Sequence, residues 1–409
     1  MIDLKPGWRA AACAAGLALM AGAPPARAQD APKAQPASAA AEDPAVGSWP
    51  KVSFDTLAML EYSGMRAASG TSRGQGLSLR FDSTALIEFN DTLSLDGLFQ
   101  FKPREPQPAS DPNRDLFINQ GAGRAEGGKM KELYIRYGDY RFGKFVQDFG
   151  RGYAIIPGPF AADFIEEPEE GYEPADMIGA ERIHVFGNET TGWRQISLSA
   201  FMVDRTFLHQ SFPYNEGMIR LQDGGVGNTR LPENIMATYD VLEQPIGHWA
   251  HMNYQASVIR WGRTYGSQAS EWWSTLGADI SIPLTGSVAD TLRGRYSQLH
   301  LFAEGARRDN FNGVRGQARD YLTVAAEYVK GPWVMDLTTT QRWTRGGPGG
   351  PQTDALYTTT LGYTLPSATL AAFSIGSETV AGRSGVYAGL RLSQTLTVCS
   401  KCMVKGRAF

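Results

Sequence analysis

The sequence predicts an all-β protein, a transmembrane antiparallel β-barrel of about sixteen strands. Three observations predict it: a secretion signal, alternation of apolar and polar residues from about Trp49 to Val398, and connections that are tight and long in turn. In the stretch 93–102, LSLDGLFQFK, one face is Leu and Phe and the other is polar. Because successive side chains of a strand point to opposite faces, such a stretch is expected to be a strand with one apolar face. Tight turns that alternate with long loops are typical of outer-membrane barrels.

Residues 1–28 have the features of a secretory signal peptide. Lys5 and Arg9 precede an apolar run at 10–23, and the sequence ARA at 26–28 is a small-x-small cleavage site. The run is too short for a spanning helix, and an uncleaved anchor is the alternative. The signal places the mature chain beyond the inner membrane. Lipid cannot satisfy the open edge of a sheet, so a membrane-embedded chain of strands must close into a barrel.

Three further segments follow the signal. Residues 29–48 are rich in Ala and Pro and are expected to form a flexible periplasmic lead-in, 49–398 the outer-membrane barrel, and 399–409 a basic tail. Cys399 and Cys402 form a lone CxxC at the start of this tail. Without a second ligand pair it is interpreted as an incidental feature, with a periplasmic disulfide as the alternative.

Composition excludes some classes of protein. The formal net charge of −3 is not that of a nucleic-acid-binding protein. A mean hydropathy of −0.28 is polar for a membrane protein. It fits a barrel, since only half of each strand meets lipid while the lumen and the loops are polar.

The alternation predicts sixteen strands, with boundaries near 50–64, 76–89, 92–103, 129–137, 140–149, 181–187, 193–206, 234–243, 248–261, 270–283, 293–306, 319–329, 332–345, 354–364, 367–377 and 385–398. Short connections fall at one end and longer ones at the other, the longest being 103–128, 150–179 and 208–233. With a periplasmic N-terminus, the long connections are all extracellular, and an even strand number returns the C-terminus to the periplasm.

A barrel of about sixteen strands is wide enough for an aqueous channel, and its selectivity then depends on lumen charges and on what narrows the pore. The residues expected to face the lumen have both signs. They are Arg80, Asp82, Glu88, Asp96, Lys102, Glu132, Arg136, Asp240, His251, Asp279, Glu327, Asp336, Arg342 and Arg391, with Arg141 as a further basic wall residue. The alternative for each is a wall residue that is merely solvated.

The connection 150–179 is the candidate constriction loop. Loops of this length in a compact domain are usually functional or disordered. If the loop folds into the lumen, its carboxylates face the basic wall and favour cations; the alternative is an exposed loop that binds divalent cations near lipopolysaccharide. Its candidate selectivity residues are Asp163, Glu166, Glu167, Glu169, Glu170 and Glu173.

The segment 133–145, LYIRYGDYRFGKF, followed by Phe149-Gly150, resembles a hairpin of Gram-negative porins. It is most similar to the phosphate- and polyphosphate-selective porin group, in which this hairpin leads into the constriction loop. That resemblance implies a porin of the outer membrane. The acidic loop departs from the anion-selective pattern of Lys and Arg, so phosphate selectivity is not implied here.

The function expected from these patterns is a passive channel for small hydrophilic solutes or ions, surrounded by outer-membrane lipid and lipopolysaccharide. Porins of this size imply a homotrimer, and nothing in the patterns calls for a cofactor. The alternatives are polysaccharide export, adhesion and, less favoured, a barrel hydrolase. None of the five histidines lies in a serine-hydrolase or metal motif, so an enzyme is not expected.

Overall fold

The computed structural model describes residues 49–67, 72–103, 126–152, 174, 176–188, 190–212, 219–285, 297–347, 349–380 and 382–399. Its strands are β1 (Lys51–Ala67), β2 (Ser72–Glu88), β3 (Leu93–Pro103), β4 (Glu126–Tyr137), β5 (Tyr140–Lys144), β6 (Met177–Asn188), β7 (Gly192–Val203), β8 (Ser211–Phe212), β9 (Asn234–Ile246), β10 (Ala250–Trp261), β11 (Glu271–Thr285), β12 (Ser297–Asp309), β13 (Ala318–Lys330), β14 (Trp333–Arg345), β15 (Gln352–Thr364), β16 (Leu370–Val380) and β17 (Arg383–Cys399). Three short 3-10 helices, η1 (Phe207–His209), η2 (Leu221–Asp223) and η4 (Phe311–Gly313), lie between strands. No helix of the described part of the chain is long and apolar enough to cross a bilayer.

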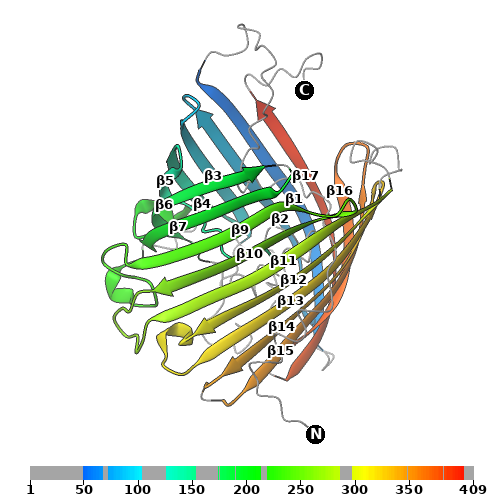
Figure 1. The fold of residues 1–409 in the computed structure, drawn as a ribbon. Coiled ribbons are helices and arrows are strands. Elements are labelled where there is room, and N and C mark those ends of the chain that lie inside the picture. Colours follow the sequence, from blue (N-terminus) through cyan, green and yellow to red (C-terminus); the bar gives the residue numbers. More distant parts are fainter. Residues whose placement is uncertain are drawn as a thin grey trace.

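The strands form one closed antiparallel sheet (Figure 1). Each long strand pairs with its sequence neighbours, and β1 pairs with both β2 and β17, which closes the barrel. The two-residue β8 lies outside this order, because β7 pairs directly with β9. The wall therefore has sixteen strands, and every strand expected from the alternation is present.

The fifth strand is shorter than expected. It was predicted over 140–149 but ends at Lys144. Gly143 has a φ of 134°, and a Cβ there would lie 2.5 Å from the carbonyl oxygen of Leu133. Beyond Lys144 the chain leaves the sheet, and residues 145–152 have no strand structure.

The two ends of the barrel differ in the length of the connections between strands. Tight turns such as 138–139 and 331–332 lie at one end, called here the turn end. The longest connections lie at the other, the loop end, although residues 286–296 join β11 to β12 at the turn end. One expectation needs correction: β16 and β17 are joined at the loop end by residues 381–382 alone, so the connections there are not all long.

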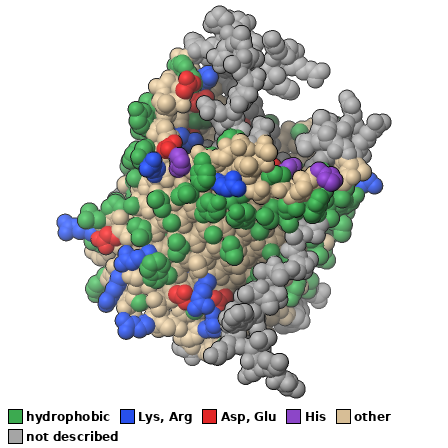
Figure 2. All heavy atoms as spheres, in the orientation of Figure 1, with side chains coloured by type: hydrophobic (Ala, Val, Ile, Leu, Met, Phe, Trp, Pro, Cys, Tyr) green, Lys and Arg blue, Asp and Glu red, His purple; other side chains and the backbone are tan. Residues whose placement is uncertain are grey.

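The outer and inner faces of the wall differ in chemistry. Along β14, Leu337 is 56% exposed, whereas its neighbours Asp336 and Thr338 are buried. Large apolar side chains are exposed in this way around the wall, and Figure 2 shows them spread over the outer surface. A closed sheet with an apolar outer face is the architecture that lipid requires of a spanning β-protein. The protein is thus an all-β outer-membrane barrel.

Candidate constriction site

Residues 145–152, called here the inner segment, lead into the predicted constriction loop at 150–179 and lie against the inside of the barrel. Ser199 of β7 donates a hydrogen bond to the Gln147 side chain at 2.8 Å. Thr238 of β9 donates to the carbonyl oxygen of Asp148 at 3.0 Å. Glu304 of β12 accepts hydrogen bonds from backbone N–H groups further along the segment. The segment therefore crosses successive strands of the inner wall.

Chain length agrees with this path. From β5 to β12 there are six steps between neighbouring strands, and a step is about 4.8 Å. The wall distance is thus about 29 Å, and a fully extended chain of eight residues spans about 27 Å. Because a chord is shorter than the curved wall, the inner segment can reach β12 without being fully extended, and it contains a turn in which the Phe149 N–H donates to the carbonyl oxygen of Gln147 at 2.8 Å.

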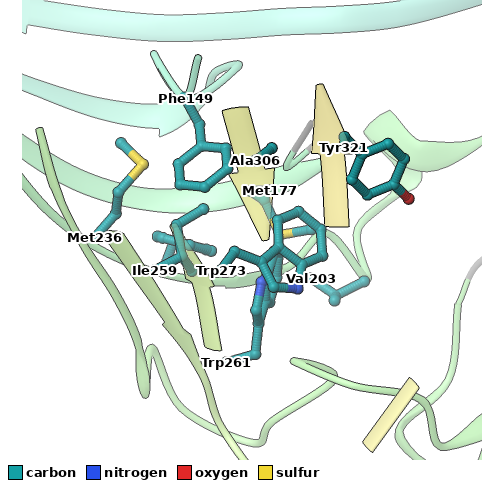
Figure 3. Close-up of a cluster of buried hydrophobic side chains, with 10 residues drawn as sticks. Phe149, Met177, Val203, Met236, Ile259, Trp261, Trp273, Ala306 and Tyr321 are labelled. Atoms are coloured by element: carbon teal, nitrogen blue, oxygen red, sulfur yellow. The ribbon is translucent and has the colours of Figure 1, made fainter. Parts of the chain in front are cut away.

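Phe149 seats the inner segment on an apolar patch of the inner wall. Its ring lies 6.0 Å from that of Trp273, centroid to centroid, and Trp273 lies 4.8 Å from Trp261. Figure 3 shows Phe149 pointing into this group. Aromatic pairs at such distances add to the gain from burying apolar surface. The other buried members are Met177, Phe201, Val203, Met236, Ile259, Ala306 and Tyr321.

Arg151 fixes the far end of the inner segment. Its guanidinium donates from Nη1 to Asp240 of β9 and from Nε to Asp279 of β11, each at 2.8 Å. Its backbone N–H donates to Glu304. Burial alone lowers the pKa of Arg151, but Asp279 and Asp240 outweigh it and raise the pKa, so the group stays charged. We call Arg151 with its three carboxylate partners the clamp.

Gly150 fits beneath Glu304 because it lacks a side chain. Its φ is 84°, and a Cβ would lie 2.9 Å from Glu304 Oε1. We expect Gly150→Ala to weaken the seating of the segment by about 1–3 kcal/mol, from backbone strain and displacement of Glu304. The control is Gly225→Ala, since Gly225 has a φ of 90° with nothing within 4 Å of its Cβ position. Larger open-channel current noise in the Gly150 variant alone is the expected result; equal noise would contradict it.

The predicted basic wall residues face inward, but with carboxylates beside them. Arg80 pairs with Asp82 at 3.0 Å and Arg342 with Asp354 at 2.8 Å, all four being buried. Arg136 is half-buried on β4. The side chain of Lys102 lies outside the described residues.

Arg141 lies at the base of the inner segment. It forms an ion pair with buried Glu181 of β6 and another with Asp148 at 3.3 Å. Its guanidinium also stacks over the Phe145 ring, 4.8 Å from the centroid. Arg141 therefore holds the start of the loop.

The predicted acidic residues of the loop, Asp163, Glu166, Glu167, Glu169, Glu170 and Glu173, lie outside the described residues. The structure brings together Asp240 and Asp279, which were expected to face the lumen, with Arg151 and Glu304, which the sequence did not single out. Lys144, whose role the sequence left open, is buried nearby in the chain. The sequence has a signal for the inner segment alone: in FGKFVQDFGRG, Lys144 directly precedes Phe145 and Arg151 follows two residues after Phe149.

No protein-family model matches the chain, and no curated protein is similar to it. Solved structures match in fold. The outer membrane channel DcaP of Acinetobacter baumannii superposes with a TM-score of 0.53 at 11% identity, over 84% of this chain and 97% of that one. The barrel has the porin fold.

Two further structures are similar at lower scores. They are an anion-selective porin from Comamonas acidovorans, with a TM-score of 0.48 at 9% identity over 85% and 100% of the two chains, and the trimer form of OmpT from Vibrio cholerae, with 0.47 at 11% over 84% and 99%. The match to DcaP supports the resemblance at the level of the porin fold, and DcaP is described as an outer membrane channel rather than as phosphate-selective.

Proposed function

We propose that the protein is a passive channel for small hydrophilic solutes, with a preference for cations over anions. The observation that carries the proposal is an excess of carboxylates. Of the buried charged side chains in the described residues, eleven are acidic (Asp82, Glu181, Asp204, Asp240, Glu271, Asp279, Glu304, Glu327, Asp336, Asp354, Glu378) and six are Lys or Arg (Arg80, Arg141, Lys144, Arg308, Arg342, Arg391). An interior with one dominant sign concentrates counter-ions and favours their passage.

Proteoliposome swelling tests this function. Liposomes that hold the purified protein are diluted into isotonic solutions of a neutral sugar, a lysine salt or a glutamate salt. Each charged solute is paired with an impermeant counter-ion, and a proton carrier dissipates the potential. We expect uptake of lysine to be faster than uptake of glutamate. Swelling no faster than that of empty liposomes would contradict a channel, and faster uptake of glutamate would contradict the cation preference.

Two carboxylates away from the clamp allow a direct test of the wall charge. Glu327 of β13 and Asp336 of β14 are cross-strand neighbours and both are buried. We expect the double variant Glu327→Gln/Asp336→Asn to lower the cation-to-anion permeability ratio roughly two- to five-fold, since a nearby unit charge contributes about 1 kcal/mol in a hydrated pore. Reversal potentials measure the ratio. The control is Asp139→Asn, an exposed turn residue, for which an equal decrease would contradict the proposal.

The acidic loop forms a second part of the proposal, supported by the inner segment that leads into it. Replacing Glu166, Glu167, Glu169 and Glu170 by Gln is expected to shift the reversal potential toward anions. An unchanged reversal potential would mean that these residues lie outside the pore and that the ion selectivity arises from the wall residues alone.

The homotrimer implied by the porin resemblance is also a proposal. Native mass spectrometry of the detergent-solubilised protein tests it, with three chains per particle expected and single chains contradicting it.

A further inference from the structure

At the loop end, the barrel wall is shorter at β5 and β6 than at β4. β4 pairs with β5 only over Leu133–Tyr137, which leaves its segment 126–132 beyond the end of β5. Residues 204–212, called here the strap, leave the end of β7 and reach this edge of β4. There Ser211 and Phe212 of β8 pair with Lys129 and Gly128. The strap therefore builds up the wall above the point where the inner segment enters the lumen.

Lys144 is buried between the strap and the loop and contacts both. Its side chain is fully buried, and its ammonium Nζ lies 3.0 Å from a carboxylate oxygen of both Asp176 and Asp204. It also donates to the carbonyl oxygen of Leu208 in the strap at 3.0 Å. Asp176 ends the loop that begins after Lys144, and the backbone N–H of Asp204 donates to the carbonyl oxygen of Asp176 at 2.8 Å. Lys144, which directly precedes the loop, thus contacts the loop's other end at Asp176 and two points on the strap.

Further basic groups face Asp176. Lys129 of β4 forms a second ion pair with it, Lys131 of β4 also acts on its charge, and Nδ1 of His209 in the strap lies 3.9 Å from its carboxylate. Burial raises the pKa of Asp176, but Lys129 and Lys144 outweigh it and lower the pKa overall. Because the folded pKa lies below the ordinary value, this contribution to stability is complete above about pH 4 and is lost as the pH falls further.

Building on the proposed function, we propose that Lys144 is a positioning residue at the base of the constriction loop, which holds the inner segment, Asp176 and the strap in one place. A buried ammonium needs all its acceptors, because an unpaired buried charge is strongly unfavourable. The base of the loop cannot move away from the wall unless Lys144 separates from Asp176. The strap cannot move away unless Lys144 separates from Asp204. Movement of either part is therefore coupled to the other.

Trypsin provides a test that does not depend on conduction. Arg151 is the only Lys or Arg between Lys144 and Arg182, so cleavage within the loop occurs after Arg151 alone. The full-length protein, folded in detergent, is digested and the fragment ending at Arg151 is quantified by mass. We expect Lys144→Met to be cut roughly ten-fold faster than wild type, because cleavage follows the population of the opened loop. Lys330→Met, which changes an exposed lysine at the turn end, is the control and should be cut at the wild-type rate.

Cleavage of Lys144→Met at the wild-type rate would overturn the proposal. If that variant does not fold, Asp204→Asn takes its place, since it retains the ammonium and weakens one acceptor; a smaller acceleration is expected, and none would overturn the proposal. In planar bilayers, the folded variant should show more frequent transient changes of conductance than wild type. A wild-type protein that does not conduct would refute the proposed function, while the trypsin result would still decide the role of Lys144.

Discussion

Arg151→Ala is expected to give a channel with a larger and noisier conductance than wild type. Arg151 carries both ion pairs that tie the inner segment to Asp240 and Asp279. Breaking a buried ion pair by removing one partner typically costs on the order of 3 kcal/mol, because the remaining charges lose their counter-charge. We expect this to favour release of the segment and rehydration of the two carboxylates. The cation preference should rise together with the conductance, and single-channel recording in a salt gradient measures both.

The matched control is Arg194→Ala. Arg194 is an arginine of β7 at the turn end, half-buried and hydrogen-bonded to Gln244 at 3.2 Å. It makes none of the clamp contacts, so its loss should leave conductance and noise unchanged. A wild-type conductance for Arg151→Ala would mean that the clamp does not hold the pore.

Leu337→Arg is expected to destabilise the barrel by about 2–4 kcal/mol, the cost of a basic side chain on the lipid face near the midplane. Leu337 lies near the middle of β14 and is exposed on the outer face. Urea unfolding in lipid vesicles, followed by tryptophan fluorescence, measures the free energy of unfolding.

The control places the same residue nearer the membrane edge. Gln341 lies on the same outward row of β14, four residues closer to Arg345 and the loop end. The cost of Arg falls to about 0–1 kcal/mol near the interface. An equal loss of stability in Gln341→Arg and Leu337→Arg would show that the outer face of β14 does not meet hydrocarbon as described.

Alternation predicted the strands because each strand of a barrel meets two different solvents. In β14, Leu337 meets lipid while Asp336 and Thr338 face the interior, so adjacent residues in the sequence differ in polarity. The number of strands and the two ends of the barrel follow from such local patterns. The early end of β5 did not follow, since Phe145 and Val146 continue to look like strand residues and only the backbone of Gly143 redirects the chain.

The site was harder to predict because its contacts join distant parts of the chain. Arg151 meets Asp279 across 128 residues, and its backbone meets Glu304 across 153. The sequence shows that each of these groups is charged, and alternation shows which wall residues face inward. It does not show which pairs meet, because that depends on the closed barrel and on the path of the inner segment. Arg80, Arg141 and Arg342 lie buried beside carboxylates, of which the predicted lumen residues included Asp82 but neither Glu181 nor Asp354.

The reversal potential of the wild-type protein in a potassium chloride gradient across a planar bilayer tests the central claim most directly. That claim is that the closed barrel encloses a pore whose interior is dominated by carboxylates. We expect discrete conductance steps and a reversal potential displaced toward the equilibrium potential of potassium. Absence of conductance, or a displacement toward the equilibrium potential of chloride, would contradict it.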